Sequence, residues 1–317
     1  MPPTSELDPP PPFDPRQPFS RAQGVRAGLT DYELRTSAYV RLFHDVYLAR
    51  DAPRTLASTA HAALLHAPRS AVVSHETAAV LWGGVVPPTS SIHLTVPPHE
   101  TYVRVGVRTH RLKGERPILI RHGLPLTSPE QTFIDLAGRL DLVQLVTLGD
   151  RLVGRGVTSP AALESAARQW PGRYRSSAQQ AARLVRPGVD SPPESRLRLL
   201  IVLAGLPEPT VNHVVRDPDT GSWLRRFELA YPDLRIAIEY EGRQHRDDDE
   251  IWASDIERRE ELDRDAWRVI QVISPGLYEA PLRTIHRIQR ARVDRGAAPT
   301  RVLSEDWRRY FPGRAAA

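Results

Sequence analysis

The stretch RRFELAYPDLRIAIEYEGRQH, residues 225–245, decides how the C-terminal part of this chain folds. Apolar and polar residues alternate on both sides of the turn-forming pair Pro232-Asp233, which predicts a β-hairpin. Because successive side chains of a strand point to opposite faces, Glu239 and Glu241 share a face and lie roughly 6.5–7 Å apart along the strand. The hairpin therefore carries two carboxylates side by side.

The register of the hairpin adds a third carboxylate. A turn centred on Pro232-Asp233 places Glu228 opposite residue 237, diagonally beside Glu239 on the same face. Glu228, Glu239 and Glu241 then repel one another unless a divalent cation lies among them. These three residues are the candidate metal ligands, in the layout of a metal-dependent nuclease site.

An ordinary sheet surface is the alternative interpretation of the same carboxylates. Alternating polar residues are normal on the wet face of an antiparallel sheet. Nearby arginines could pair with the carboxylates one by one: Arg225, Arg226, Arg235 and Arg243. The spacing leaves both interpretations open.

From about residue 191 to about residue 293 the chain resembles the very-short-patch-repair-like (Vsr-like) branch of the PD-(D/E)xK nuclease superfamily, and within it an actinobacterial domain family. The segments that carry this resemblance are SPPESRLRLLIVLAGLPEP, FELAYPDLRIAIEYEGRQH, DIERREELDRDAWRVIQV and APLRTIHRIQRARV. The resemblance implies a restriction-endonuclease-like α/β domain, in the order helix, hairpin, helix, strand, helix.

The same resemblance implies roles for individual residues. Glu228 fills the metal-binding aspartate position, Glu239 the next acidic position and Glu241 the position usually held by lysine. Glu194 matches the acid of the first helix, and His245 matches the histidine of Vsr-like members. The implied cofactor is Mg²⁺ or Mn²⁺, and the implied reaction is metal-assisted hydrolysis of a phosphodiester bond.

This chain departs from the superfamily pattern at two positions. Glu228 is one methylene longer than the usual aspartate, and geometry at a small cation is demanding. The only lysine of the chain is Lys113, far from the hairpin in the sequence, so proton transfer falls to His245 or to a metal-activated water. Both departures also fit a domain that has lost catalysis.

Glu194 and His245 each have a structural interpretation as well. Ser191-Pro192-Pro193-Glu194 has the pattern of a helix capping box, in which Glu194 reaches back to the cap. His245 precedes an acidic run, residues 247–250, which a solvated loop explains. Capping and metal-site roles are compatible for Glu194.

Composition narrows the class of protein. The 317 residues suffice for two or three domains. The formal charge is +5 and the pI is about 9.8, and the positive charges come almost entirely from arginine. Arginine suits the recognition of phosphate, but its use in place of lysine is also typical of a high-GC coding sequence. The absence of cysteine excludes disulfides and thiolate metal sites. The sequence has no long apolar run and no signal peptide, so we expect a cytoplasmic protein without membrane attachment. It has no P-loop and no dinucleotide-binding turn, so we expect no small-molecule cofactor.

Residues 19–49 predict a small winged helix-turn-helix, after a disordered proline-rich leader at 1–18. Ser20 can cap a first short helix, and Thr30-Asp31-Tyr32-Glu33 is a capping box that starts a second, the candidate recognition helix. Strands then form a wing, and the candidate DNA contacts are Arg26, Arg35 and Arg41. The alternative is a helical arm that packs on the middle domain and contacts no DNA.

With the stretches SHETAAVLWG and GLPLTSPEQTFIDLA, this segment resembles the AbiEi-type antitoxin regulators of type IV toxin–antitoxin systems. The resemblance implies DNA binding, a mixed α/β domain over 50–186 and a possible toxin partner. Helix-turn-helix units have no fixed signature residues. Four histidines of this middle region lack ligand spacing, so we expect them to be scattered structural or surface residues: His75, His93, His110 and His122.

The expected fold class is a multidomain α/β (α+β) protein, with the endonuclease-like domain at 187–298 and a C-terminal tail at 299–317. The leading functional hypothesis is a DNA-binding protein with a metal-dependent endonuclease domain. The alternative is a non-catalytic, antitoxin-like transcriptional regulator with a degenerate nuclease fold. A third hypothesis is a partner of a toxin that acts by protein contact alone.

Overall fold

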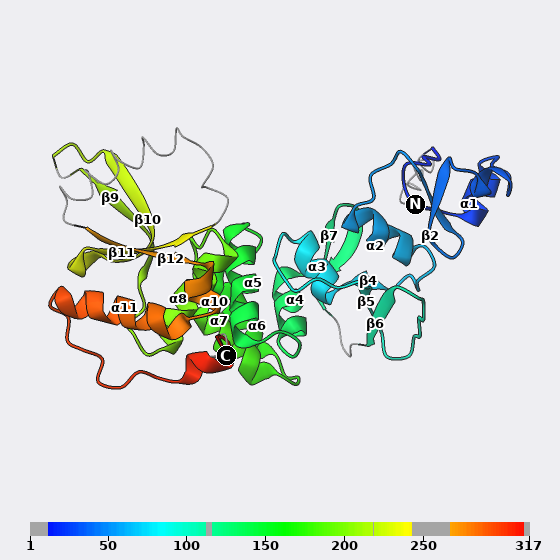
Figure 1. Cartoon of the computed structure of the whole chain (residues 1–317). Coiled ribbons are helices and arrows are strands. Elements are labelled where there is room, and N and C mark those ends of the chain that lie inside the picture. The colour runs from blue at the N-terminus through cyan, green and yellow to red at the C-terminus, as the bar shows by residue number, and fades with distance from the viewer. Residues whose placement is uncertain (1–11, 112–115, 218, 243–266, 314–317) are drawn as a thin grey trace, which may run out of the picture. The chain divides into compact units, whose positions relative to one another are not determined.

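The computed structural model describes residues 12–111, 116–217, 219–242 and 267–313. The chain is of the mixed α/β class and divides into two compact units (Figure 1). Unit 1 comprises Met1–Leu81 and Pro87–Ser128, and unit 2 comprises Trp82–Val86 and Pro129–Ala317. No helix in the described part of the chain is long and apolar enough to cross a membrane.

Unit 1 begins with a small sheet and one short helix. The antiparallel strands have the order β1-β3-β2. The elements are β1 (Phe19–Ser20), α1 (Arg21–Arg26), the 3-10 helix η1 (Glu33–Arg35), β2 (Tyr39–Phe43) and β3 (Val46–Ala49). Ser20 caps α1 in a full capping box with Gln23, which confirms the expected first helix.

The expected second helix is wrong. The capping contacts form, since Thr30 N–H donates to Glu33 Oε2 at 2.7 Å and Glu33 N–H donates to Thr30 Oγ1 at 3.2 Å. However, the Thr36 hydroxyl donates to the Glu33 carbonyl at 2.7 Å and its backbone is extended (φ −73°, ψ 172°), so the chain leaves the helix after one turn. The candidate recognition helix is therefore only the three residues of η1.

Part of the proline-rich leader is also more ordered than expected. Ala49 N–H donates to the Pro15 carbonyl at 2.8 Å, and the Phe13 ring packs edge-to-face on Phe19 with centroids 5.0 Å apart. An aromatic contact and a backbone hydrogen bond therefore hold residues 13–17 against the small sheet. The remainder of the expected leader, residues 1–11, lies outside the described residues.

The rest of unit 1 is a five-stranded mixed sheet with two helices. Its strand order is β6-β5-β4-β8-β7, with parallel pairs β5–β6 and β4–β8. The elements are α2 (Leu56–Leu64), β4 (Val72–Val73), α3 (His75–Leu81), β5 (Ile92–Val96), β6 (Val107–Arg111), β7 (Ile118–Arg121) and β8 (Leu124–Thr127). Leu94 on β5 and Leu126 on β8 are fully buried in the core of this part of unit 1.

Unit 2 opens with a helical layer. Its helices are α4 (Pro129–Leu136), α5 (Leu142–Gly154), α6 (Pro160–Gln169) and α7 (Arg175–Leu184), followed by α8 (Pro192–Leu203). A buried ion pair joins α5 to α8: Arg198 Nη2 lies 3.0 Å from Asp150 Oδ2, and both side chains are fully buried. The expected boundary at residue 187 thus falls inside unit 2, between α7 and α8.

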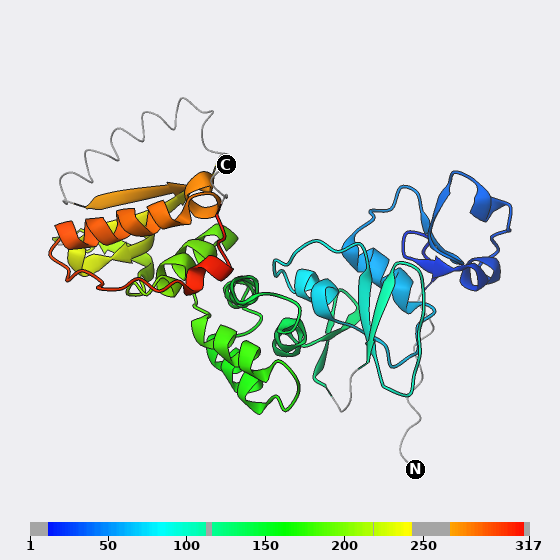
Figure 2. The same ribbon diagram turned by 60° about the horizontal axis from the view of Figure 1, so that its bottom comes forward.

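A four-stranded sheet completes unit 2, with the order β12-β11-β10-β9. Strands β9 (Thr210–Arg216), β10 (Trp223–Tyr231) and β11 (Ile236–Glu241) form an antiparallel meander, and β12 (Arg268–Ile273) runs parallel to β11. The 3-10 helix η2 (Pro232–Leu234) joins β10 to β11, and α10 (Ser274–Tyr278) and α11 (Pro281–Asp294) follow β12. Figures 1 and 2 show α8 and α11 against the sheet.

The residues after α11 are anchored to unit 2. Ser304 N–H donates to the Ala204 carbonyl at 3.0 Å, just after α8. The 3-10 helix η4 (Asp306–Arg309) buries Trp307, and Phe311 is buried beside it. The expected tail at 299–317 therefore contributes to the core of this unit as far as the structure describes it.

Candidate functional site: an acidic cluster at the β10–β11 hairpin

The hairpin forms, but its register differs from the expected one. Leu229 pairs with Ile238 and Ala230 with Ala237, so Glu228 lies level with Glu239 instead of residue 237. The reason is the turn, which is the 3-10 helix η2 closed by Arg235 in the left-handed region at φ +50°. This longer turn shifts the pairing by two residues, which preserves the face on which the glutamates lie.

Glu228 on this face is influenced by the charges of two other predicted site residues, Glu239 on the same hairpin and Glu194 on α8. The pKa of Glu228 is raised to about 7, first because burial penalises its charged form and then because the charges of Glu194, Glu239 and Asp190 repel it. The Tyr240 N–H donates to Glu228 Oε2 at 2.7 Å and opposes that rise. We call Asp190, Glu194, Glu228 and Glu239 the acidic cluster.

Glu194 of the acidic cluster lies in the first turn of helix α8. Ser191 is the N-cap and its Oγ accepts from the Glu194 N–H at 3.3 Å, as expected. The Glu194 carboxylate, however, accepts from the Asp190 N–H at 3.1 Å, one residue before the cap. Burial raises the pKa of Glu194. Glu194 therefore stabilises the start of the helix and contributes charge to the cluster.

Two arginines neutralise part of the acidic cluster. Arg225 Nη2 lies 3.2 Å from both carboxylate oxygens of Glu239, and Arg226 Nη2 lies 2.8 Å from Asp190 Oδ2. Glu194 and Glu228 form no ion pair with any residue in the described part of the chain. Arginine pairing, one of the two interpretations left open by the spacing, thus accounts for Glu239 but not for Glu228.

The remaining predicted residues are not brought into this arrangement. Glu241 ends β11, pairs with Ile273 of β12, and its side chain makes no hydrogen bond or ion pair within the described ranges. His245 lies outside the described residues. Asp190 was missed by the sequence analysis, because a residue just before a helix cap carries no signal that distinguishes it from any polar loop residue.

The donors of the acidic cluster suit a hard divalent cation, since all are carboxylate oxygens. Among the residues that the structure describes, no group of three His, Asp or Glu side chains already has metal-binding spacing. Binding a cation requires the Glu239 carboxylate to leave Arg225, whereas Glu228 can keep Oε2 on the Tyr240 N–H and offer Oε1. The cluster is thus a site of the right donor type whose side chains must rearrange.

The three arginines predicted to contact DNA lie in unit 1, and two of them line the same hollow. A hollow of about 480 Å³ is lined by Arg35 and Arg41 together with two arginines that the sequence analysis did not select, Arg21 and Arg50. Arg21 forms an ion pair with Asp31, which also lines the hollow. Arg26 ends α1, is exposed, and does not line this hollow.

Three histidines expected to be scattered are in fact together in unit 1. The rings of His75 and His110 stack with centroids 3.5 Å apart, and His93 Nδ1 lies 3.0 Å from His110 Nε2. His93 is buried and its Nδ1 lies 2.8 Å from Glu76 Oε2. The parallel pairing of β5 with β6 brings His93 beside His110, and His75 joins them from the start of α3; such non-local packing leaves no mark in the spacing of the sequence.

No family model matches this chain. Two proteins of Mycobacterium tuberculosis, bearing the names Uncharacterized protein MT2308 (strain CDC 1551 / Oshkosh) and Uncharacterized protein Rv2248 (strain H37Rv), are each 26% identical to it over 264 residues. Each alignment covers 82% of this chain and 94% of the relative, so the similarity extends over both units. The crystal structure of the RV2827C protein from the same species aligns with 15% identity and a TM-score of 0.39, over 65% of this chain and 86% of that one.

Proposed function

We propose that this chain is a DNA-binding protein whose unit 2 hydrolyses phosphodiester bonds with the help of Mg²⁺ or Mn²⁺. The observation that carries the proposal is the convergence of Glu194, Glu228 and Glu239, with the Glu228 pKa raised to about 7. Carboxylates held close in a half-buried site repel one another, and a divalent cation is the ligand that relieves this repulsion. Perturbed carboxylates of this kind are more frequent at functional sites than elsewhere.

Each residue has a part in the proposed site. Glu228 and Glu239 would hold the cation, helped by Glu194. The bound cation would supply charge stabilisation at the phosphoryl group and activation of water. The Tyr240 N–H keeps Glu228 at the cluster, and the helix cap fixes Glu194. The proton relay is assigned to His245.

Plasmid nicking by the full chain tests this function. We expect nicking that requires Mg²⁺ or Mn²⁺ and is lost in Glu239→Ala. Glu164→Ala is the matched control, because Glu164 forms an ordinary surface ion pair with Arg168 on α6 of the same unit. Equal nicking by the wild type and Glu239→Ala contradicts the catalytic proposal.

A second candidate is a non-catalytic, antitoxin-like transcriptional regulator, and the contact between Arg225 and both oxygens of Glu239 favours it. A carboxylate that already has a guanidinium partner has less need of a cation. This candidate predicts operator binding without a divalent metal, weakened in Arg35→Ala and unchanged in Glu239→Ala. A toxin that binds the chain directly would be its partner in such a system, and co-purification with that toxin tests this version.

A further inference from the structure

Helix α11 of unit 2 carries a second concentration of arginine. Its inner face is fully buried through Ile285, Ile288 and Ala291, which recur at helical spacing. The exposed face bears Arg283, Arg287 and Arg290, with His286 beside them. We call the three arginines the α11 stripe.

The α11 stripe is regularly spaced and largely uncompensated. Positions i, i+4 and i+7 place successive Cα atoms about 6 Å and about 4.5 Å apart along the helix axis. Within the described part of the chain, the side chains of Arg283 and Arg290 form no ion pair or hydrogen bond. Arg287 Nη2 donates to the Gln271 carbonyl of β12 at 3.0 Å, which fixes that side chain without neutralising its charge.

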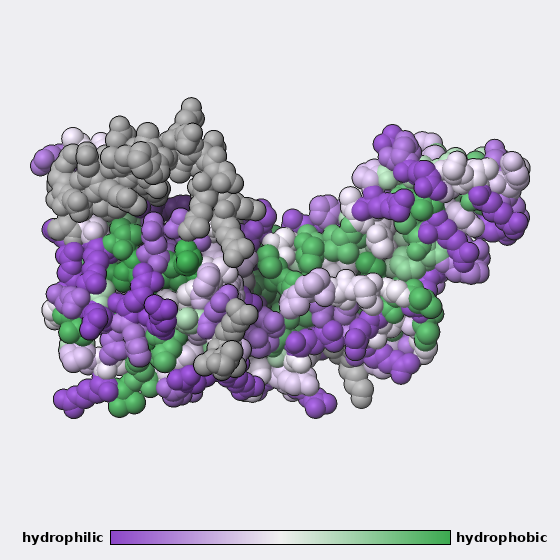
Figure 3. Space-filling view, in the orientation of Figure 1, coloured by the Kyte–Doolittle hydropathy of each residue, from purple (hydrophilic) through white to green (hydrophobic). Residues whose placement is uncertain are grey.

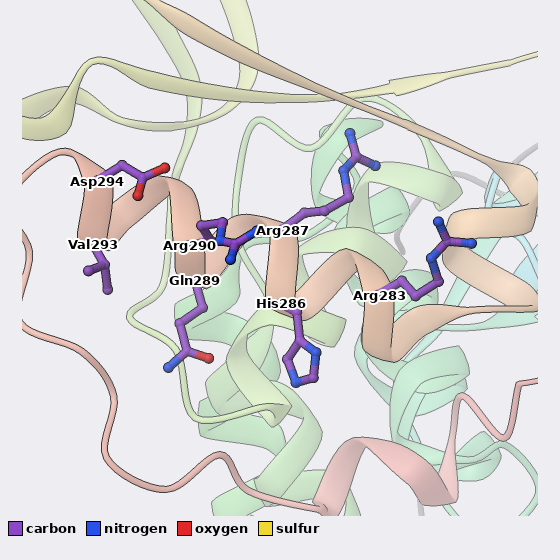
Figure 4. Close-up of a pocket in the computed structure, with 7 residues that line it drawn as sticks. All are labelled: Arg283, His286, Arg287, Gln289, Arg290, Val293 and Asp294. Carbon is purple, nitrogen blue, oxygen red and sulfur yellow. The ribbon is translucent and has the colours of Figure 1, made fainter.

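The surroundings of the stripe favour an anionic partner. A hollow of about 680 Å³ runs along the helix and is lined by Arg283, His286, Arg287, Gln289, Arg290, Val293 and Asp294 (Figure 4). Asp294, the one acid in this lining, lies 2.7 Å from Arg268 and so already has a partner. Figure 3 shows a mainly hydrophilic surface over α11, interrupted by small hydrophobic patches.

No Phe, Tyr or Trp side chain belongs to this lining, whose one aromatic ring is the His286 imidazole, and this favours one kind of nucleic acid. Proteins that bind single strands stack bases on aromatic rings, whereas duplexes are held through their phosphates. Arginine is well suited to phosphate because its planar fork donates two hydrogen bonds at once. A row of three arginines with a single imidazole and no larger ring beside it therefore matches the phosphate backbone of a duplex better than the bases of a single strand.

We propose that the α11 stripe binds the phosphate backbone of duplex DNA and positions it on unit 2. The inference deepens the proposed function, since it adds a substrate-holding surface to the unit that carries the acidic cluster. It requires no divalent cation, because arginine and phosphate bind directly.

The test is the salt dependence of duplex binding by the full chain in EDTA, followed by fluorescence anisotropy. The stripe variant Arg283→Gln/Arg287→Gln/Arg290→Gln loses three phosphate contacts. The slope of log K against log salt should become less steep by about 2 to 3, and binding at about 0.1 M salt should weaken by roughly 100-fold. The pair Arg283→Gln/Arg290→Gln, which keeps the Arg287–Gln271 contact, should lose about 2 in slope if the triple variant proves unstable.

The matched control removes the same charge elsewhere in unit 2, in Arg168→Gln/Arg173→Gln/Arg183→Gln, all exposed residues of the α6–α7 region. Its slope should stay close to that of the wild type. An identical loss of slope in the stripe variant and the control overturns the proposal. Tighter binding of single-stranded DNA or duplex RNA than of duplex DNA overturns it as well. If the stripe variant behaves as expected while the wild type nicks no plasmid, the nuclease proposal fails and this inference stands.

Discussion

Replacing Glu228 by Gln should stabilise the metal-free protein at a pH above about 7. In the wild type Glu228 is half-buried, faces Glu194, Glu239 and Asp190, and has a pKa raised to about 7. Glutamine keeps the shape of the side chain, and its carbonyl oxygen can still accept from the Tyr240 N–H. The substitution therefore removes the charge and retains the hydrogen bond.

The sign and size of this effect follow from the two protonation equilibria. Between the ordinary glutamate pKa of 4.5 and about 7, the folded state retains the proton that the unfolded state loses, so stability falls as pH rises. The difference between these two pKa values corresponds to roughly 3 kcal/mol of unfolding free energy, and solvent screening of the half-buried Glu228 carboxylate reduces this to about 2 kcal/mol. The loss of stability caused by the Glu228 charge is absent below about pH 4.5 and complete above about pH 7.

Urea unfolding of the wild type and Glu228→Gln in EDTA, at about pH 4.5 and about pH 8, measures this difference. The variant should be more stable by about 2 kcal/mol at the higher pH and equally stable at the lower one. Glu164→Gln, on the surface of α6, should show no such dependence. A variant that is less stable than the wild type at the higher pH, or whose gain does not change with pH, refutes the reasoning that Glu228 is a destabilised carboxylate.

Three further predictions concern unit 2. Arg198→Met should lower the free energy of unfolding by about 3–5 kcal/mol in urea titrations, because it leaves the Asp150 carboxylate buried without its partner. Arg225→Gln should tighten Mn²⁺ binding by about tenfold in calorimetry, since it releases Glu239; weaker binding would mean that Arg225 supports the site. Gly149→Ala should destabilise by about 1–3 kcal/mol, because its Cβ would lie 2.4 Å from Val185 Cγ2; an unchanged melting curve would show that the core yields there.

The local features of the C-terminal hairpin could be predicted from the sequence. Alternation placed Phe227 and Leu229 in the core, where both are fully buried, and left the glutamates on the other face. Ser191 caps α8 as its pattern indicated. These features depend on neighbours within a few residues, which the sequence displays directly.

The features that depend on turn geometry or distant pairing could not be predicted. The 3-10 turn at Pro232–Leu234 shifted the register of the hairpin, although the odd-even pattern survived because the shift was of two residues. The capping pattern at Thr30 formed without an α-helix after it, since Thr36 diverted the chain. The stacked histidines joined their cluster through tertiary packing, and Asp190 joined the acidic cluster through a contact with Glu194 that no sequence pattern marks.

The central claim, that the acidic cluster binds a divalent cation, is tested most directly by following thermal unfolding of the full chain as Mn²⁺ is added. A cation that binds the folded state stabilises it by about 2.7 kcal/mol at roughly 100 times its Kd. The transition of unit 2 should therefore rise by several degrees in the wild type and in Glu164→Gln, and remain unchanged in Glu228→Gln. A wild type that does not respond, or an equal rise in Glu228→Gln, contradicts the claim.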